Sequence, residues 1–260
     1  MRDDDPLCIR AFELQPDYDL FELLIEKIYE KFLKPGDCAI DGGCNTGRHT
    51  IPLANIVGLS GRVIGFEPIP ILAKRLQAKM AELPQLQIHN KAISAAPGHS
   101  TFEVFPGRMG WSSLRTRSDA SDLDRQVIDV EVTTIDSLPS SALAKLRFIK
   151  LDIEGAELDA MRGAKRTIAL LKPMIIFENG GLSVAKRYGY PVDMEDWFGF
   201  FQSCGYVVFD IIGRPYTRSF WQALERAPWN SIAVAEDSQG ARFMQDEFPA
   251  LLHATMSGCR

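Results

Sequence analysis

Apolar residues recur at two different spacings along the chain, and the change from one spacing to the other predicts the order of the elements. Segment 19–33 carries leucine, isoleucine and phenylalanine every three or four positions, which is typical of an amphipathic helix. After a turn at Pro35-Gly36, short apolar runs alternate with helical patterns. The expected strands cover 38–41, 62–66, 86–89, 148–152 and 174–178, and the expected helices cover 46–58, 70–83 and 157–171. Strands separated by helices predict βαβ units and a parallel sheet.

A second pattern interrupts this alternation. Segments 101–105 and 127–133 alternate apolar and polar residues with period two, so they predict added antiparallel strands. Beyond 178 we expect a helix at 194–204 and strands at 206–211 and 231–235, whereas the end of the chain shows no clear pattern. The organisation predicted is an N-terminal helical extension over 1–34, one α/β domain over 35–236 and a C-terminal tail over 237–260.

Composition narrows the class of protein. A chain of 260 residues that is 46% hydrophobic is long enough for one α/β domain with a full core. The net charge of −5 gives no support for a nucleic-acid partner, because phosphate contacts need clustered Lys and Arg. The five cysteines are scattered without a C-x-x-C pair, which argues against a disulfide framework or a cysteine zinc site. We find no secretory signal and no membrane span, and expect a cytoplasmic protein; the oligomeric state, including a homo-oligomer, stays open.

Glycines follow the first predicted strand and predict a ligand site. Asp41 ends the strand, and Gly42, Gly43 and Gly47 form the turn that leads into the next helix, with Asn45 between them. Ligands of open α/β sheets bind at the carboxyl ends of the strands, and glycine lets a ligand approach the backbone. The spacing does not fit the G-x-G-x-x-G dinucleotide pattern. An acid at this strand end repels a pyrophosphate but suits a cationic ligand such as S-adenosylmethionine (SAM).

The next two strand ends extend this site. Glu67 ends the second strand, directly before Pro68, and a carboxylate there accepts hydrogen bonds from ribose hydroxyls. NAD-dependent enzymes share this feature, so Glu67 indicates an adenosine ribose rather than one particular cofactor. The third strand ends at Asn90, Lys91 and Ala92, where an adenine would lie if the sheet is wound in this order.

Charged residues gather at the end of strand 148–152. Lys150 and Asp152 share one face of the strand, and Glu154 and Glu157 follow at the mouth of the sheet. We take these four residues, and His49 beside the glycine turn, as candidate catalytic residues, with Asp152 also near the cofactor. Structural roles are open as well: Lys150 needs a carboxylate partner inside an apolar strand, and Glu157 complements a helix dipole.

The loop between the two antiparallel segments is a candidate acceptor site. Trp111 offers an apolar face on which a sugar ring could stack, and Ser112 and Ser113 offer hydroxyls for orienting hydrogen bonds. Binding residues are often carried on loops held by a rigid scaffold. The alternative is a surface loop whose tryptophan packs against the core.

Motifs in the order found here resemble the FkbM-like family of SAM-dependent methyltransferases. The similarity rests on 39–47, Phe66-Glu67-Pro68, the segment 90–94 followed by Gly98, the segment 134–136 and the signature 149–157. It implies a Rossmann-like class I methyltransferase fold, with a seven-stranded, mostly parallel sheet, helices on both faces and a last strand that is antiparallel. One departure is Gly43, where the family usually has Ala. Since another small residue leaves the turn intact, we expect no loss of SAM binding.

The function predicted is SAM-dependent O-methylation of a hydroxyl on a sugar or another small-molecule or natural-product acceptor. An NAD-dependent oxidoreductase and a non-catalytic SAM-binding protein are the alternatives. We expect no metal, because none of the four histidines stands at metal-ligand spacing from another. Asp152, or else Lys150 or His49, would take or steer the proton of the hydroxyl.

Overall fold

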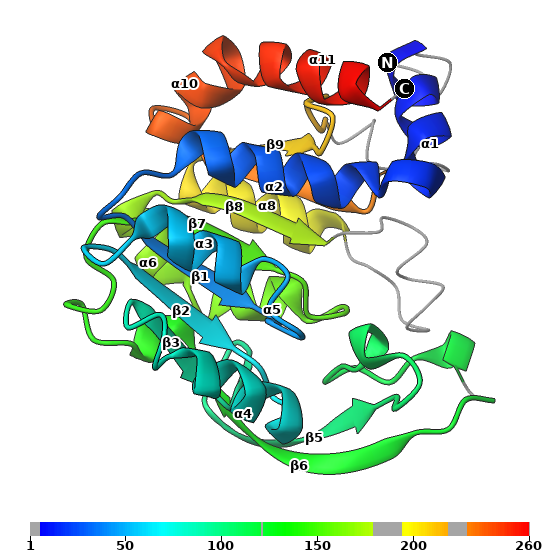
Figure 1. The fold of residues 1–260 in the computed structure, drawn as a ribbon, viewed down its shortest axis with the longest axis vertical. Helices are drawn as coiled ribbons and strands as arrows, with labels where there is room; N and C mark the ends of the chain where they lie inside the picture. The colour runs from blue at the N-terminus through cyan, green and yellow to red at the C-terminus, as the bar shows by residue number, and fades with distance from the viewer. Residues whose placement is uncertain (1–5, 121, 179–193, 218–227, 260) are drawn as a thin grey trace.

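A seven-stranded sheet forms the centre of the computed structural model, which describes residues 6–120, 122–178, 194–217 and 228–259. The strand order is β3-β2-β1-β7-β8-β10-β9 (Figure 1). Only β10 runs antiparallel to its neighbours among these strands, which confirms the predicted mostly parallel sheet with a reversed last strand. The strands are β1 (Cys38–Gly42), β2 (Arg62–Phe66), β3 (Leu86–His89), β7 (Leu146–Leu151), β8 (Met174–Glu178), β9 (Tyr206–Asp210) and β10 (Asn230–Ala235).

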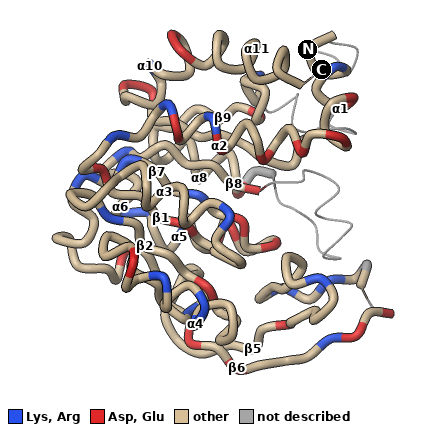
Figure 2. Tube along the Cα trace, in the orientation of Figure 1, with Lys and Arg blue, Asp and Glu red and all other residues tan. Residues whose placement is uncertain are grey.

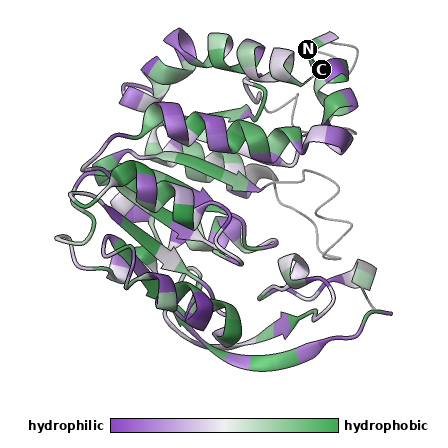
Figure 3. Cartoon of the chain, viewed as in Figure 1, coloured by the Kyte–Doolittle hydropathy of each residue, from purple (hydrophilic) through white to green (hydrophobic). Residues whose placement is uncertain are grey.

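Helices cover both faces of the sheet, as predicted, because neighbouring residues of each buried strand point to opposite sides. Ala39 and Ile176 belong to one apolar cluster, while Ile40 and Phe177 belong to the other. Figure 3 shows hydrophobic strands between amphipathic helices. The first face carries α1 (Pro6–Tyr18), α2 (Leu20–Phe32), α3 (Thr50–Val57), α4 (Pro70–Lys79), α10 (Gln239–Asp246) and α11 (Phe248–Gly258). The second carries α5 (Glu157–Arg162), α6 (Lys165–Leu171) and α8 (Met194–Cys204).

Three predicted helices are shorter than the sequence pattern suggested, and the one expected over 70–83 ends at Lys79. The helix expected over 46–58 begins at Thr50, because 46–49 remain part of the turn after β1. The helix expected over 157–171 is divided into α5 and α6. Asp136 provides the physical reason: its N–H donates to the Gly163 carbonyl at 2.9 Å, and its carboxylate accepts the N–H groups of Arg166 and Thr167 at 2.9 and 2.8 Å. A side chain from a distant segment therefore caps a new helix start.

The two ends of the chain pack together on the first face. The N-terminal region holds two helices rather than the one predicted, separated at Asp19, which has a left-handed φ of 47°. The tail that showed no clear pattern forms α10 and α11, and the Phe32 and Phe243 ring centroids lie 5.5 Å apart. Figure 1 shows α1 beside the end of α11. The division into an extension, a domain and a tail stays a prediction.

The interrupting segments form a small sheet of their own instead of adding to the main one. Its order is β4-β6-β5, with β5 antiparallel to β6 as predicted, and β4 parallel to it. Phe102 and Val130 pack there against Leu72 of α4, which fixes the insert beside the carboxyl ends of β1 and β2. The short helical turn η1 (Met109–Trp111) projects from it. The strands are β4 (Ala92–Ile93), β5 (Gly98–Val104) and β6 (Gln126–Thr133).

Other expectations concern surface and covalent features. No disulfide joins the five cysteines, all of which lie within the described ranges. Acidic and basic residues occur together on helices α2 and α5 (Figure 2). Within the residues that the structure describes, every helix is too short or too polar to cross a membrane.

Candidate active site

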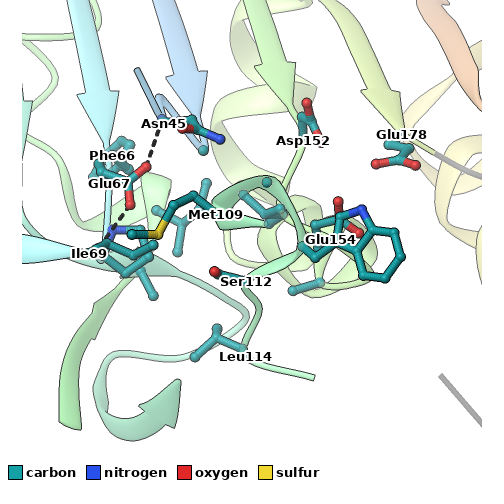
Figure 4. Close-up of a pocket in the computed structure, with 18 of the residues that line it drawn as sticks. Asn45, Phe66, Glu67, Ile69, Met109, Ser112, Leu114, Asp152, Glu154 and Glu178 are labelled. Atoms are coloured by element: carbon teal, nitrogen blue, oxygen red, sulfur yellow. Dashed lines mark hydrogen bonds between the residues drawn. The ribbon is translucent and has the colours of Figure 1, made fainter. Parts of the chain in front are cut away.

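A pocket of about 310 Å³ opens where the carboxyl ends of the parallel strands meet the insert (Figure 4). Its size lies within the range of small-molecule sites. One side, the apolar end, is lined by Phe66, Ile69, Leu72, Ile93, Phe102 and Met109. The other side, the acidic end, is lined by Glu22, Asp152, Glu154, Glu178, Trp229 and Asn230.

The glycine turn contributes Gly43 and Asn45 to the pocket wall, whereas Gly42 and Gly47 lie outside it. Gly43 has a φ of +83°, and a Cβ added there would meet the Asp152 carbonyl oxygen at 2.0 Å. Glycine at this position thus fits the turn, as expected, whereas the Ala that is usual in the family would collide here with backbone. A Cβ at Gly42 would meet a side-chain atom of Ile93 at 2.7 Å. These glycines primarily allow the turn to pack against neighbouring segments.

Asp41 is buried behind the pocket instead of lining it. One carboxylate oxygen accepts a hydrogen bond from Thr50 Oγ1 at 2.6 Å, so Asp41 holds the start of α3. It lies opposite Lys150 in the register of β1 and β7. Its place in the structure is therefore between the sheet and α3.

Glu67 stands at the wall between β2 and α4 with its carboxylate fixed by backbone. The Asn45 N–H donates to Oε2 at 2.7 Å, and the Ile69 N–H donates to Oε1 at 2.9 Å (Figure 4). Burial raises the pKa of Glu67 to about 7, although both backbone hydrogen bonds oppose the rise. A carboxylate offers about four acceptor positions, so roughly two stay available to a ligand. Pro68 also lines the pocket.

The third strand places its three predicted residues differently. Lys91 and Ala92 line the pocket, and Lys91 Nζ pairs with Glu131 Oε1 at 2.5 Å. Asn90 lies outside the lining. Its Nδ2 donates to the carbonyl oxygens of Glu67 and Pro68, each at 2.9 Å. Asn90 therefore positions the backbone that carries Glu67.

Lys150 and Asp152 form an ion pair at the end of β7, with Nζ 3.0 Å from Oδ2. Burial alone lowers the pKa of Lys150, but Asp152, Asp41 and Glu22 outweigh it and the pKa is raised. Burial acts in the opposite sense on Asp152, yet the charge and hydrogen bond of Lys150 lower the pKa of that carboxyl overall. The Asp152 side chain lines the pocket and keeps 34% of its surface exposed. Asp152 is thus an ionised carboxylate that a ligand can reach.

Glu154 connects the pocket to the insert. Its Oε2 lies 2.8 Å from Nη1 of the buried Arg117, and its carbonyl oxygen accepts from Ser113 Oγ at 2.6 Å. Arg115 pairs with Asp159 just beyond. The loop after β7 and the insert are therefore held together at Glu154.

Glu157 lies outside the pocket lining and stabilises the same loop. Its carboxylate accepts the N–H groups of Ile153 at 2.9 Å and Gly155 at 3.0 Å. Burial raises the pKa of Glu157 to about 8. These contacts agree with the structural reading of Glu157 as a group that complements backbone N–H donors at the start of α5.

Four lining residues of the acidic end were not predicted. Glu178 ends β8 and lies opposite Asn230 of β10 in the strand register. Glu22 comes from α2, and Trp229 precedes β10. The strand-end rule that identified Glu67 and Asp152 could have identified Glu178. No sequence signal marked the other three, because α2 and β10 lie far from β7 in the chain.

His49 contacts the pocket lining through Glu22. Its Nε2 lies 2.6 Å from Glu22 Oε2, and the His49 side chain is buried outside the lining.

Asp152, Glu154 and Glu178 each bring one carboxylate oxygen within 4.8 Å of the others. Lys150 and Arg117 already compensate two of these charges. The expected absence of a metal stays a prediction.

The insert covers the pocket with Trp111 and Ser112, while Ser113 lies outside. The guanidinium carbons of Arg108 and Arg117 lie 4.2 and 4.3 Å from the Trp111 ring centre. Ser112 Oγ accepts the Phe105 N–H at 3.2 Å and keeps its own O–H as a donor. Ser113 Oγ is occupied on both sides, because it donates to Glu154 and accepts from the Arg115 N–H at 2.9 Å.

A sheet with a reversed last strand, a glycine turn after β1 and an acid after β2 define a class I methyltransferase fold. The methyltransferase FkbM domain matches residues 41–208, which is more than half of the chain, and the chain belongs to this family. SAM is the cofactor that membership of this family assigns to the chain. The NAD-dependent alternative is thereby excluded.

Matches to individual proteins are partial. The chain is 36% identical over 93 residues to protein-L-isoaspartate O-methyltransferase 1 of Arabidopsis thaliana, covering 34% of this chain and 36% of that protein. It is 23% identical over 172 residues to methyltransferase 1 of Beauveria bassiana, covering 59% and 69%. The crystal structure of an FkbM methyltransferase from Methylobacillus flagellatus KT is 17% identical, with a TM-score of 0.48 over 86% of this chain and 60% of that one. The chain thus spans about a third of the length of the first curated relative.

Proposed function

We propose that this protein transfers the methyl group of SAM to a hydroxyl of a sugar or of a similar polyhydroxylated small molecule. The observation that carries the proposal is one continuous pocket with two chemically different ends. The apolar end beside Glu67 suits an adenosine, and the acidic end beside Asp152 suits a hydroxylated acceptor.

The residues at the apolar end have the chemistry that SAM requires. Phe66 and Ile69 offer apolar surface for an adenine, and Glu67 keeps acceptor positions for the two ribose hydroxyls. Gly43 and Asn45 supply the wall between Glu67 and Asp152. The carboxylates of the acidic end match the positive charge of the sulfonium. When bound, SAM supplies an electrophilic methyl group that needs no further activation.

The acidic end favours a neutral hydroxyl over an anionic acceptor. Asp152 and Glu154 are held as carboxylates by Lys150 and Arg117, and both accept hydrogen bonds from hydroxyl groups. A carboxylate acceptor would be repelled by them. Trp111 and Trp229 add aromatic surface at the rim, on which the apolar face of a sugar ring can pack.

The residues of the chain mainly orient the acceptor. Asp152 accepts the hydrogen bond of the acceptor hydroxyl and aims its oxygen toward the cofactor end. Lys150 fixes the Asp152 carboxylate, and the insert, fastened at Glu154, excludes water from the pocket. Glu157 acts on the loop rather than on the acceptor, whereas Glu154 both lines the pocket and fastens the loop to the insert.

The test is a turnover assay with SAM and a panel of sugars, glycolipids and natural-product alcohols. We expect turnover with at least one polyhydroxylated acceptor and a roughly 10²–10⁴-fold loss in Asp152→Asn. SAM, but not NAD, should raise the melting temperature. An isoaspartyl peptide belongs in the panel because of the Arabidopsis relative. Turnover of that peptide alone would contradict the proposal, as would turnover of no alcohol.

A further inference from the structure

We propose that Glu22, on helix α2, binds the ammonium group of the methionine part of SAM. The inference rests on the proposed position of the adenosine at the apolar end and is independent of the acceptor. It assigns a cofactor-binding role to α2, which precedes the segment 41–208 that matches the FkbM domain.

Helix α2 brings its first turn to the edge of the sheet that carries the pocket. In Figure 1, α2 lies beside α3, and its beginning lies at the end of the sheet toward which the arrow of β8 points. Glu22 lines the pocket, and the neighbouring Phe21 packs against the lining residue Trp229 with ring centroids 5.2 Å apart. Two successive residues of α2 thus help to build the same part of the pocket wall.

The carboxylate of Glu22 is fixed at one oxygen and open at the other. Its Oε2 lies 2.6 Å from His49 Nε2 and 3.9 Å from Nε of Arg48. Arg48 itself is bonded to Asp19 at 2.5 Å and to Glu26 at 3.0 Å. Within the described part of the chain Oε1 of Glu22 accepts no hydrogen bond, and the side chain keeps 19% of its surface exposed. Oε1 can therefore accept from an ammonium while Oε2 keeps its contact with His49.

Glu22 also lies beside the segment that continues from the proposed ribose position. The Asn45 N–H donates to Glu67 Oε2 at 2.7 Å, so the turn after β1 adjoins the apolar end directly. The same turn leads to His49 at the start of α3, to which Glu22 is bonded. A ribose held by Glu67 therefore leaves the methionine chain of SAM beside this turn, with Glu22 on its far side.

The other acids of the acidic end differ from Glu22 in position or in charge balance. Buried cations already pair with Asp152 at 3.0 Å and with Glu154 at 2.8 Å. Glu178 ends β8, which is separated from β1 by β7. Among the described acids of this end, Glu22 is the one whose carboxylate is bonded to the segment between β1 and α3. An ammonium is a charged donor that such a fixed carboxylate complements.

Two ligands that differ only in the amino group test this contact. S-adenosylhomocysteine carries the ammonium, whereas its deamino analogue keeps the adenosine and the carboxylate. Isothermal titration calorimetry measures the affinity of the protein for each ligand, without an acceptor. Glu22→Gln keeps the shape and removes the charge. It should weaken the binding of S-adenosylhomocysteine by roughly 10–100-fold, the range for a hydrogen bond to a charged group, and change the affinity for the analogue by less than about threefold.

The ratio of the two affinities is the decisive quantity. An unfolded fraction of the variant affects both ligands equally, so it leaves this ratio unchanged. Glu26→Gln, one turn later on the same helix, is the matched control, because Glu26 is bonded to Arg48 and lies outside the pocket lining. Its affinities for both ligands should equal those of the wild type. SAM should raise the melting temperature of Glu26→Gln as in the wild type, and that of Glu22→Gln by less.

The outcomes separate this proposal from the proposed function. Equal weakening of both ligands in Glu22→Gln, or weakening of neither, would overturn the role of Glu22. Glu67→Ala should weaken both ligands, because both contain the adenosine. If it weakened neither, the proposed position of the adenosine would be wrong, and the role of Glu22 with it. Turnover of no alcohol by the wild type would contradict the proposed acceptor and leave ammonium binding at Glu22 standing.

Discussion

The two ends of the pocket hold their carboxylates by different means. At the apolar end, Glu67 is bound by two backbone N–H groups and forms no ion pair with the Lys and Arg residues that the structure describes, and burial raises its pKa to about 7. At the acidic end, Asp152 is bound by the ammonium of Lys150, and its pKa is lowered. Backbone donors position a carboxylate, while a buried cation also determines its protonation state.

This difference has consequences for stability as well as for binding. The apolar end depends on the shape of the glycine turn, where the backbone of Gly43 touches the end of β7. The acidic end depends on ion pairs formed by Lys150 and Arg117, whose side chains are almost fully buried. A substitution that changes the glycine turn should therefore affect the apolar end. A substitution that removes a buried charge should affect the acidic end.

The largest effect is expected from Lys150→Met. It leaves the carboxylates of Asp152 and Asp41 without their buried cation, and breaking a buried pair on one side costs about 3–5 kcal/mol. Chemical denaturation measures the loss in free energy of unfolding. Lys79→Met, at an exposed pair with Glu82, is the control and should change stability by less than about 0.5 kcal/mol. A stable Lys150→Met variant would show that the acidic end does not depend on this cation.

Gly43→Ala should follow, with a loss of about 2–5 kcal/mol in the free energy of unfolding. The left-handed backbone costs about 1–2 kcal/mol, and the collision with the Asp152 carbonyl adds strain of about 1–3 kcal/mol. Gly58→Ala is a matched control, because Gly58 also has a positive φ but no atom within 4 Å of an added Cβ. Equal losses in the two variants would contradict a role for the close approach.

Glu67→Ala should weaken SAM binding by about 1.5–3 kcal/mol, because hydrogen bonds to a charged carboxylate are lost. Isothermal titration calorimetry on the folded variant measures the affinity. If SAM affinity fell in Asp152→Asn but not in Glu67→Ala, the ribose would bind at the acidic end of the pocket, which would contradict the role proposed for Glu67.

The pH dependence of SAM affinity gives a smaller effect of about tenfold. With a pKa of about 7, Glu67 changes from mostly protonated at pH 6 to mostly ionised at pH 8, and the ionised form is the better acceptor for hydroxyls. The free energy of unfolding of the SAM-free protein should change with pH in the opposite direction to the SAM affinity. Because the pKa of Glu67 is raised on folding, Glu67 adds stability at low pH, and this contribution is lost as the pH rises through about 7. Both slopes should become flatter in Glu67→Gln, measured by calorimetry and by denaturation.

The smallest stability effect is expected from Trp111→Ala, at about 1 kcal/mol. Its ring is partly exposed and contacts two guanidinium groups, so the loss is that of cation–π contacts rather than of a buried tryptophan. The kcat/KM for the acceptor should fall more than the affinity for SAM. A fall in melting temperature with unchanged acceptor kinetics would assign the residue to packing alone.

Much of the apolar end could be predicted from the sequence because its parts follow one another in the chain. Gly43 follows β1 and Glu67 follows β2, and adjacent parallel strands bring their carboxyl ends together. The acidic end could be predicted only in part. Asp152 stands in a clear motif, whereas Glu22 and Trp229 come from an N-terminal helix and from the segment before the last strand.

The sequence by itself determined that this chain forms a parallel sheet with acids at its strand ends, because side-chain direction follows from local periodicity and strands separated by helices pair in parallel. Tertiary structure alone decided which acids reach the pocket and which carry a charge. Asp41 faces α3, Glu157 binds its own loop, and Glu178 lies beside Asp152. A carboxyl group takes its protonation state from burial and from charges brought close by distant segments, and a linear pattern does not contain those distances.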